Sequence, residues 1–240
     1  MRHLVHFTPI ITTLLTIPFT IVLFRHWRKK PEALYLMWWM IGVFTYGVGT
    51  LTESLTTLFG WQLPVFKAWY ISGALLGGAP LAQGSIYLLM KRKTGHILTS
   101  ALLVTVAVAS VFVLMSPVDV AAVETYRLSG AVFEWQWVRL FSPFINTYAL
   151  IFLVGGAFWS AMKYRSAGDN YRVRYVGNIL IAVGALLPGI GGAATRAGYV
   201  EVLYVTELLG LTLIWLGYHK MASDRTDSIH ANQAVVAAQD

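Results

Sequence analysis

Long apolar runs constrain the fold of this chain more than any other feature. A helix that crosses a bilayer needs roughly 17–25 predominantly apolar residues. Seven runs fit this requirement, at residues 7–24, 34–59, 68–90, 96–115, 138–162, 175–195 and 202–218. A spanning segment must satisfy its own backbone hydrogen bonds, which favours helices. The sequence therefore predicts an all-α, polytopic membrane protein built as a bundle of seven transmembrane helices.

Composition supports the same class of protein. Hydrophobic residues make up 57% of the chain and charged residues only 12%, whereas ordinary globular chains are about 25% charged. The chain has no cysteine, so disulfides and thiolate chemistry are excluded. Its formal charge of +7 could indicate nucleic-acid binding. Most Lys and Arg residues flank apolar runs, however, which is typical of membrane topology, and we expect no nucleic-acid partner.

The basic residues predict the orientation of the bundle. One set of loops holds only Arg2, Lys67, Arg127, Arg139 and Arg196. The opposite set holds the remaining Lys and Arg residues, which are Arg25, Arg28, Lys29, Lys30, Lys91, Arg92, Lys93, Lys163, Arg165, Arg172, Arg174, Lys220 and Arg225. Loops rich in Lys and Arg face the cytoplasm. We therefore expect a multi-pass plasma-membrane protein with its N-terminus outside and its C-terminus in the cytoplasm.

Two further boundaries follow from the pattern. The first run is followed directly by basic residues and has no small-residue cleavage site, so it is predicted to be a retained helix and not a signal peptide. Residues 1–220 form the predicted transmembrane domain, and 221–240 form a short polar tail that we expect to be disordered. The fourth run carries only Ser and Thr as polar residues from Ile97 to Met115, and is predicted to be the most lipid-exposed helix.

Two glutamates lie inside apolar runs, Glu53 in 34–59 and Glu207 in 202–218. A carboxylate at membrane depth is costly and indicates a functional site. Glu53 lies six residues from Phe59 and Glu207 six residues from Glu201, so each is about 9 Å below the outer boundary. We predict an outward-open pocket for a small polar or amphipathic ligand. Its polar frame comprises Glu53, Glu207, Arg196, Arg139 and Asn146, and its aromatic walls are Trp69, Tyr70 and Tyr204.

A structural explanation of the same residues stays open. Glu53 and Glu207 could form ion pairs with Arg196 and Arg139 that only lock the bundle. Small residues also have a structural interpretation, because Gly73 and Gly77 have the spacing that lets two helices pack closely. Pro188 followed by Gly189 predicts a kink or a broken helix, which would be a hinge.

Cofactor and enzyme chemistry find no support in the motifs. The last run contains no lysine for a retinal Schiff base, no histidine lies mid-membrane to hold haem, and the histidines at the ends of runs are not expected to form a metal site. No hydrolase, metalloprotease or phosphate-loop motif is present. We predict no cofactor, no metal and no catalytic residue.

One resemblance bears on function. The segment Tyr46–Glu53 followed by Phe66–Gly73 resembles part of the amino-terminal seven-helix sensor region of some bacterial histidine kinases. This chain ends after the seventh run, with no kinase. The chain is also similar to uncharacterised bacterial seven-span membrane proteins. The resemblance to sensors implies a stand-alone sensing bundle that signals through a protein partner in the membrane or on its cytoplasmic side.

Three functions follow as hypotheses. The first is a sensor or accessory subunit that binds a small ligand from the outer side. The second is a small-molecule or proton-coupled transporter, in which Glu53 and Glu207 change protonation and Pro188 marks the hinge. The third is a structural subunit of a membrane complex.

Overall fold

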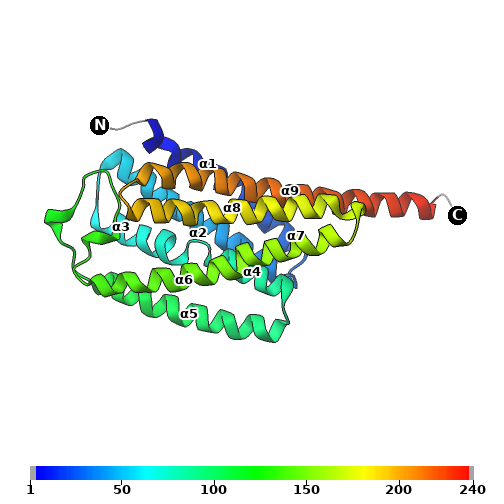
Figure 1. Ribbon diagram of the computed structural model, residues 1–240, viewed down its shortest axis with the longest axis horizontal. Coiled ribbons are helices and arrows are strands. Elements are labelled where there is room, and N and C mark those ends of the chain that lie inside the picture. The colour runs from blue at the N-terminus through cyan, green and yellow to red at the C-terminus, as the bar shows by residue number, and fades with distance from the viewer. Residues whose placement is uncertain (1–3, 238–240) are drawn as a thin grey trace.

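The computed structural model describes residues 4–237, with side chains as far as Asp224. This part of the chain is helical and forms no β-strand, only an isolated antiparallel β-bridge between Val118 and Phe133. The main helices lie side by side along one long axis, and the irregular segment between α5 and α6 covers one end of the bundle (Figure 1). The elements are η1 (Leu4–Phe7), α1 (Thr8–Lys29), α2 (Leu34–Phe59), α3 (Leu63–Trp69), η2 (Tyr70–Leu76), α4 (Ala79–Leu89), α5 (Arg92–Met115), η3 (Val120–Ala122), η4 (Gly130–Val132), η5 (Gln136–Leu140), α6 (Phe141–Ala149), η6 (Leu150–Gly155), α7 (Gly156–Ser166), η7 (Asp169–Tyr171), α8 (Arg172–Arg196) and α9 (Val200–Ala237).

Six helical segments in the described chain are long and apolar enough to cross a membrane. Each contains one of the predicted runs, so six of the seven are confirmed as continuous helical segments. The helix Arg92–Met115 has the smallest buried share of the six, 17%, which confirms the fourth run as the most exposed. The six segments are Leu4–Lys29, Leu34–Phe59, Arg92–Met115, Gln136–Ser166, Asp169–Arg196 and Val200–Asp224.

The third predicted run, 68–90, is not one continuous helix. It is divided into α3, the π-helical η2 and α4, with the interruption at Gly77, whose φ is +27°. Interrupted backbone in an apolar bundle needs hydrogen-bond partners from its neighbours. Two side chains of α6 supply them, because Ser142 Oγ and Asn146 Nδ2 donate to the Ala74 carbonyl at 2.8 and 3.4 Å.

A broken helix at Pro188, one of the two predicted alternatives, is wrong, since α8 runs continuously from Arg172 to Arg196. The kink and its role as a hinge stay predictions. A proline removes the N–H that would bond to the carbonyl four residues earlier, here that of Gly184. This carbonyl faces α9 at Gly210, where a Cβ would lie 2.6 Å from the Gly184 oxygen and 3.0 Å from Pro188 Cδ. The absent side chain of Gly210 leaves room for both the proline ring and the carbonyl.

The α8 and α9 helices approach each other closely at two levels. A Cβ on Gly184 would lie 2.6 Å from the Gly210 carbonyl oxygen, and a Cβ on Gly217 would lie 2.5 Å from the Gly177 oxygen. Such contacts are shorter than a real side chain allows, so the backbones meet through glycine, as in other close helix pairs. Gly189 lies off this contact, because a Cβ there would meet nothing within 4 Å.

Helical backbone continues beyond Met221, where the sequence predicts the start of a disordered tail. The α9 helix extends to Ala237, although only Val200–Asp224 is apolar enough to count as a candidate span. Residues 1–3 and 238–240 lie outside the described chain. Disorder of the tail in solution stays a prediction.

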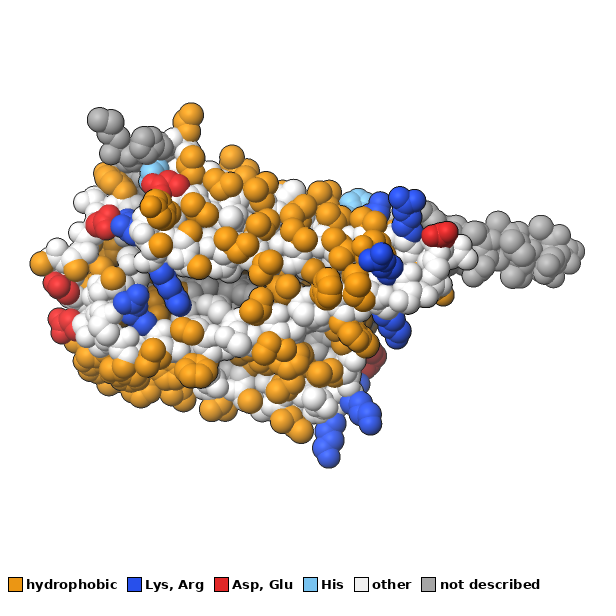
Figure 2. Space-filling view, in the orientation of Figure 1, with side chains coloured by type: hydrophobic (Ala, Val, Ile, Leu, Met, Phe, Trp, Pro, Cys, Tyr) orange, Lys and Arg blue, Asp and Glu red, His pale blue; other side chains and the backbone are white. Residues whose placement is uncertain are grey.

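The two ends of the bundle differ in charge (Figure 2). Lys and Arg side chains gather at the end from which α9 projects, here called the basic end. Both acidic and basic side chains occur at the opposite end, here called the loop end, which holds η1 and the segment between α5 and α6. Hydrophobic side chains cover much of the surface between them, as expected for a lipid-facing bundle.

A buried aromatic cluster attaches the α5–α6 segment to the loop end. Phe133 of that segment packs against Phe66 and Tyr70, with ring centroids 4.9 and 4.8 Å apart. All three side chains are buried. The segment is therefore a packed part of the fold, and its polar residues have defined positions over the bundle.

Candidate functional site

The two intramembrane glutamates meet inside the bundle. Glu53 of α2 is 2% exposed, and Glu207 of α9 is partly buried with an inaccessible Oε2. The two carboxyl groups lie close enough to each other for their side chains and charges to interact. Trp69 Nε1 donates to Glu53 Oε1 at 2.9 Å, whereas Oε2 of each glutamate has no hydrogen-bond partner. This pair, Glu53 with Glu207, is called the carboxyl pair below.

The carboxyl pair lies below the loop end and not at the surface. Glu53 is six residues before the end of α2 at Phe59, which places it about 9 Å inside the helix. Glu207 follows the start of α9 at Val200 by seven residues, or about 10 Å. Tyr46 OH bonds to the Glu207 backbone carbonyl at 3.0 Å, so α2 and α9 are joined at this level.

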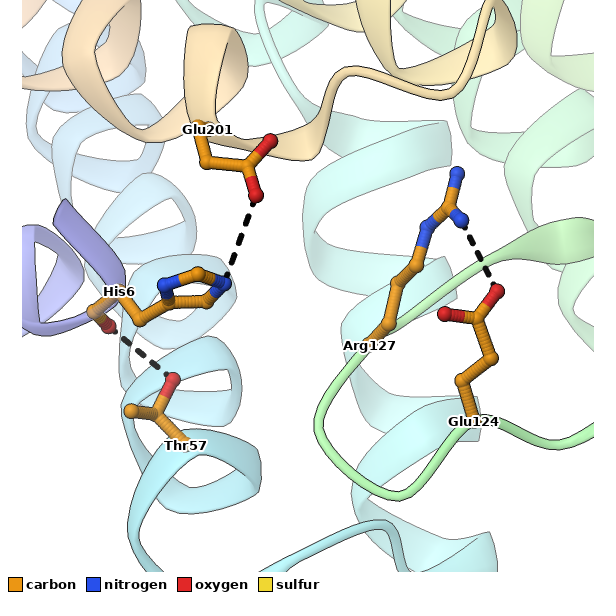
Figure 3. A network of polar contacts seen from close by, with 5 residues as sticks. All are labelled: His6, Thr57, Glu124, Arg127 and Glu201. Carbon is orange, nitrogen blue, oxygen red and sulfur yellow. Dashed lines mark hydrogen bonds and ion pairs between the residues drawn. The ribbon is translucent and has the colours of Figure 1, made fainter. Parts of the chain in front are cut away.

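A polar cleft opens at the loop end near the carboxyl pair. Its volume is about 560 Å³. Figure 3 shows His6 and Glu201 facing Glu124 and Arg127, which belong to the α5–α6 segment. His6 Nε2 lies 3.6 Å from Glu201 Oε1, and Arg127 Nη1 bonds to Glu124 Oε1 at 2.9 Å. The cleft is lined by His6, Glu124, Thr125, Tyr126, Arg127, Gly198, Val200 and Glu201.

Two side chains, those of Arg127 and Glu201, make the cleft suited to a polar ligand. Arg127 Nε is inaccessible and has no hydrogen-bond acceptor. The Glu201 side chain is 45% exposed, so part of it faces the open space. An unpaired buried donor is costly. The Arg127 side chain is itself 26% exposed. The cleft therefore presents a guanidinium and a nearby carboxylate, which together suit a small molecule with both acceptor and donor groups.

Tyr204 links the cleft to the carboxyl pair. Its side chain is fully buried, and it lies one turn beyond Glu201 in α9. Its ring packs edge-on against His6, with centroids 6.1 Å apart. Its hydroxyl is close enough to the carboxyl pair, Glu201 and Arg127 to interact with their charges. A continuous series of polar and aromatic groups thus leads from the cleft to the buried carboxyls.

The two arginines expected in the pocket lie elsewhere at the loop end. Arg139 Nη1 bonds to Gln136 Oε1 at 2.6 Å, and both Arg139 and Arg196 are near the Tyr70 hydroxyl. Neither forms an ion pair with the carboxyl pair. The side-chain ion pairs of the described residues are His6–Glu201, Arg92–Glu32, Arg127–Glu124 and Arg174–Asp224.

The remaining predicted residues have mainly structural contacts. Asn146 Nδ2 bonds to Ser142 Oγ at 3.0 Å, beside the interruption of the third run. Gly73 lies against α2, where a Cβ on Gly49 would be 3.3 Å from the Gly73 Cα. Gly77 instead occupies the interruption itself. Among the predicted aromatic walls, Trp69 and Tyr204 contact the site, and Tyr70 packs in the aromatic cluster.

No family model, curated protein or solved structure matches this chain. The function must therefore be argued from the site itself. No group of three or more His, Cys, Asp or Glu side chains in the described residues could hold a metal ion.

None of the eight residues that line the cleft belongs to the predicted pocket. The four ionisable ones are His6, Glu124, Arg127 and Glu201. Each lies next to an apolar run or in the α5–α6 segment, where charged residues are ordinary. The available signal was the mixture of Glu124 and Arg127 with the Trp residues of a long connection. Periodicity does not say where such a connection folds over the bundle, so these residues could not be assigned to the site in advance.

Proposed function

We propose that this chain is a multi-pass plasma-membrane protein that binds a small polar ligand from the outer side and acts as a sensor or accessory subunit. The polar cleft over the carboxyl pair is the observation that carries the proposal. Binding sites are usually concave, with a few polar groups that fix the orientation of the ligand. Its opposed Arg127 and Glu201 favour a ligand that carries both an anionic or acceptor group and a donor.

The direction of access follows from the charge distribution. Loops rich in Lys and Arg stay in the cytoplasm, so the basic end would lie inside and the cleft outside. In this arrangement the interrupted segment α3–η2–α4 would be the seventh crossing, because it connects α2 with α5. A ligand bound between Glu201 and Arg127 would contact both α9 and the α5–α6 segment. It could favour one arrangement of them only if it binds that arrangement more tightly.

Transport is the second candidate, and one observation favours it. Interrupted helices near membrane depth commonly form the substrate sites of transporters. Here the interrupted segment supplies Trp69, which bonds to Glu53. A carrier would move that segment relative to α2. The carboxyl pair would then be reached from each side of the membrane in turn.

A thermal-shift screen tests the ligand proposal. We expect a zwitterionic, amino-acid-sized compound to raise the melting temperature of the purified wild-type protein in detergent, since saturation at one hundred times Kd stabilises a protein by about 2.7 kcal/mol. Arg127→Gln and Glu201→Gln should each weaken the response at least tenfold, because each removes one charged contact.

The matched control is Arg92→Gln, which removes an exposed ion pair with Glu32 at the basic end. This variant should respond to the compound as the wild type does. If all three variants respond equally, the compound binds outside the cleft. If a library of such zwitterions shifts none of the proteins, the proposed ligand class is wrong.

A further inference from the structure

We propose that Glu53 and Glu207 form a proton-binding site, in which the two carboxyl groups hold one proton between them and exchange it with the outside through the polar cleft. This inference stands on the buried geometry and does not require the cleft to have a ligand. The sensor hypothesis and the structural hypothesis give the carboxyl pair no role in binding a proton.

The first argument is the absence of a compensating charge. Two ionised carboxylates in contact repel each other, and burying them in an apolar bundle adds a desolvation cost. Lys or Arg would be the usual partner, yet none of the ion pairs among the described residues involves Glu53 or Glu207. Trp69 donates one neutral N–H to Glu53 Oε1, which does not balance two negative charges.

The second argument is the pair of unsatisfied oxygens. Oε2 of Glu53 and Oε2 of Glu207 are both inaccessible and have no donor. A proton placed between the two carboxyl groups converts one into a donor and leaves the other as its acceptor. An O–H···O⁻ bond of this kind is short and strong. It removes one charge and supplies a donor to one of the pair in a single step.

A metal ion fits the pair less well than a proton. Cations such as Na⁺ or Ca²⁺ take several oxygen ligands. The pair offers two carboxyl groups, and a neighbouring hydroxyl, that of Tyr46, already donates to the Glu207 carbonyl. No cluster of three acidic or histidine ligands occurs in the described part of the chain.

The groups that surround the pair define its route to water. Tyr46 lies beside it on α2, Trp69 faces it from α3, and Tyr204 lies above it on α9. Tyr204 is also within range of Glu201 and Arg127 and packs against His6 at the cleft. The Arg139 and Arg196 charges act on Tyr70 of η2 instead. Tyr204 therefore connects the pair with the polar groups of the cleft, which is the route that we assign to the proton.

Binding the proton would change how α2 and α9 interact. With one proton bound, the carboxyl groups attract each other across the two helices. When the proton leaves, two like charges face each other in the same space. The Tyr46 bond to the Glu207 backbone stays in both states, so the change is confined to the level of the pair and can bias the packing of α9 without separating the helices.

Infrared difference spectroscopy tests the proposal on the full chain in detergent. A protonated carboxylic acid has a carbonyl stretching band that a carboxylate lacks. At neutral pH the exposed carboxyl groups are ionised, so we expect one such band from the pair in the wild type. It should be lost completely in Glu53→Gln/Glu207→Gln and kept in Glu32→Gln, which removes an exposed carboxylate at the basic end. No band in the wild type, or the same band in the double variant, would overturn the proposal.

Melting temperatures against pH give a second measurement. Proton loss removes the stabilising contact, so the wild type and Glu32→Gln should lose stability as pH rises. The double variant is neutral at this position, so its melting temperature should lack this part of the pH dependence. Circular dichroism checks that it keeps its helix content, and Glu207→Gln alone replaces it if it does not. Stabilisation by NaCl over choline chloride, lost in the variant, would instead identify a cation site and contradict the proposal.

Discussion

Gly184→Ala should destabilise the protein by roughly 2–3 kcal/mol, a cost typical of overpacking a tight contact. The added Cβ would lie 2.6 Å from the Gly210 carbonyl oxygen and 3.0 Å from the Ile214 backbone nitrogen. Neither backbone atom can move without displacing α9. The free energy of unfolding, measured by titration with a denaturing detergent, should fall accordingly.

The same substitution on the same helix provides the control. Gly189→Ala adds a Cβ that meets nothing within 4 Å, and alanine favours a helix over glycine by roughly 0.5–1 kcal/mol. This variant should be as stable as the wild type or slightly more stable. Equal destabilisation by the two substitutions would mean that α8 and α9 do not meet through Gly184.

Gln83→Leu should cost roughly 2–3 kcal/mol, since it deprives buried polar groups of their partner. Gln83 of α4 is fully buried. Its Nε2 donates to Gly95 O at 3.0 Å and to Thr99 Oγ1 at 2.7 Å, and its Oε1 accepts from Tyr148 OH. One side chain thus joins α4, α5 and α6.

Detergent unfolding also measures this effect. Gln62→Leu is the matched control, because Gln62 is an exposed residue at the start of α3. It should change the free energy of unfolding by less than about 0.5 kcal/mol. A wild-type stability for Gln83→Leu would show that the three helices do not depend on this network.

The sequence was most informative where hydrophobicity alone decides structure. The run 34–59 was predicted with the same limits that α2 has. The third run failed because its hydrophobicity is equally high, while its conformation depends on partners from α6. Ser142 and Asn146 reach the Ala74 carbonyl from more than sixty residues away in the chain, and no local pattern reports that contact.

Local helix propensity also predicted a possible break in α8 that the structure does not have. Pro188 and Gly189 are the strongest helix-breaking pair in the chain by propensity, but Gly210 on α9 accommodates the proline ring. Packing between two helices therefore outweighed the local preference. The contact face itself uses Gly177, Gly184 and Gly191, which are seven residues apart. A Cβ on Gly189 would meet nothing within 4 Å.

The candidate site was predictable in its acids and not in its surroundings. Charge inside an apolar run singled out Glu53 and Glu207. The structure places Glu53 six residues before the end of α2 and Glu207 seven residues after the start of α9. Their mutual contact depends on how α2 and α9 pack. The cleft was harder to predict, because Arg127 lies on the α5–α6 segment and the position of this segment depends on contacts such as the packing of Phe133 on the bundle.

Cysteine accessibility in intact cells tests the central claim most directly, namely that the cleft opens to the outside. The chain has no cysteine of its own, so a single substitution gives an unambiguous signal. Thr125→Cys lines the cleft, and Ser166→Cys lies exposed at the basic end. A membrane-impermeant maleimide should label Thr125→Cys without permeabilisation and Ser166→Cys only after it. The reverse pattern would place the cleft in the cytoplasm and contradict the account.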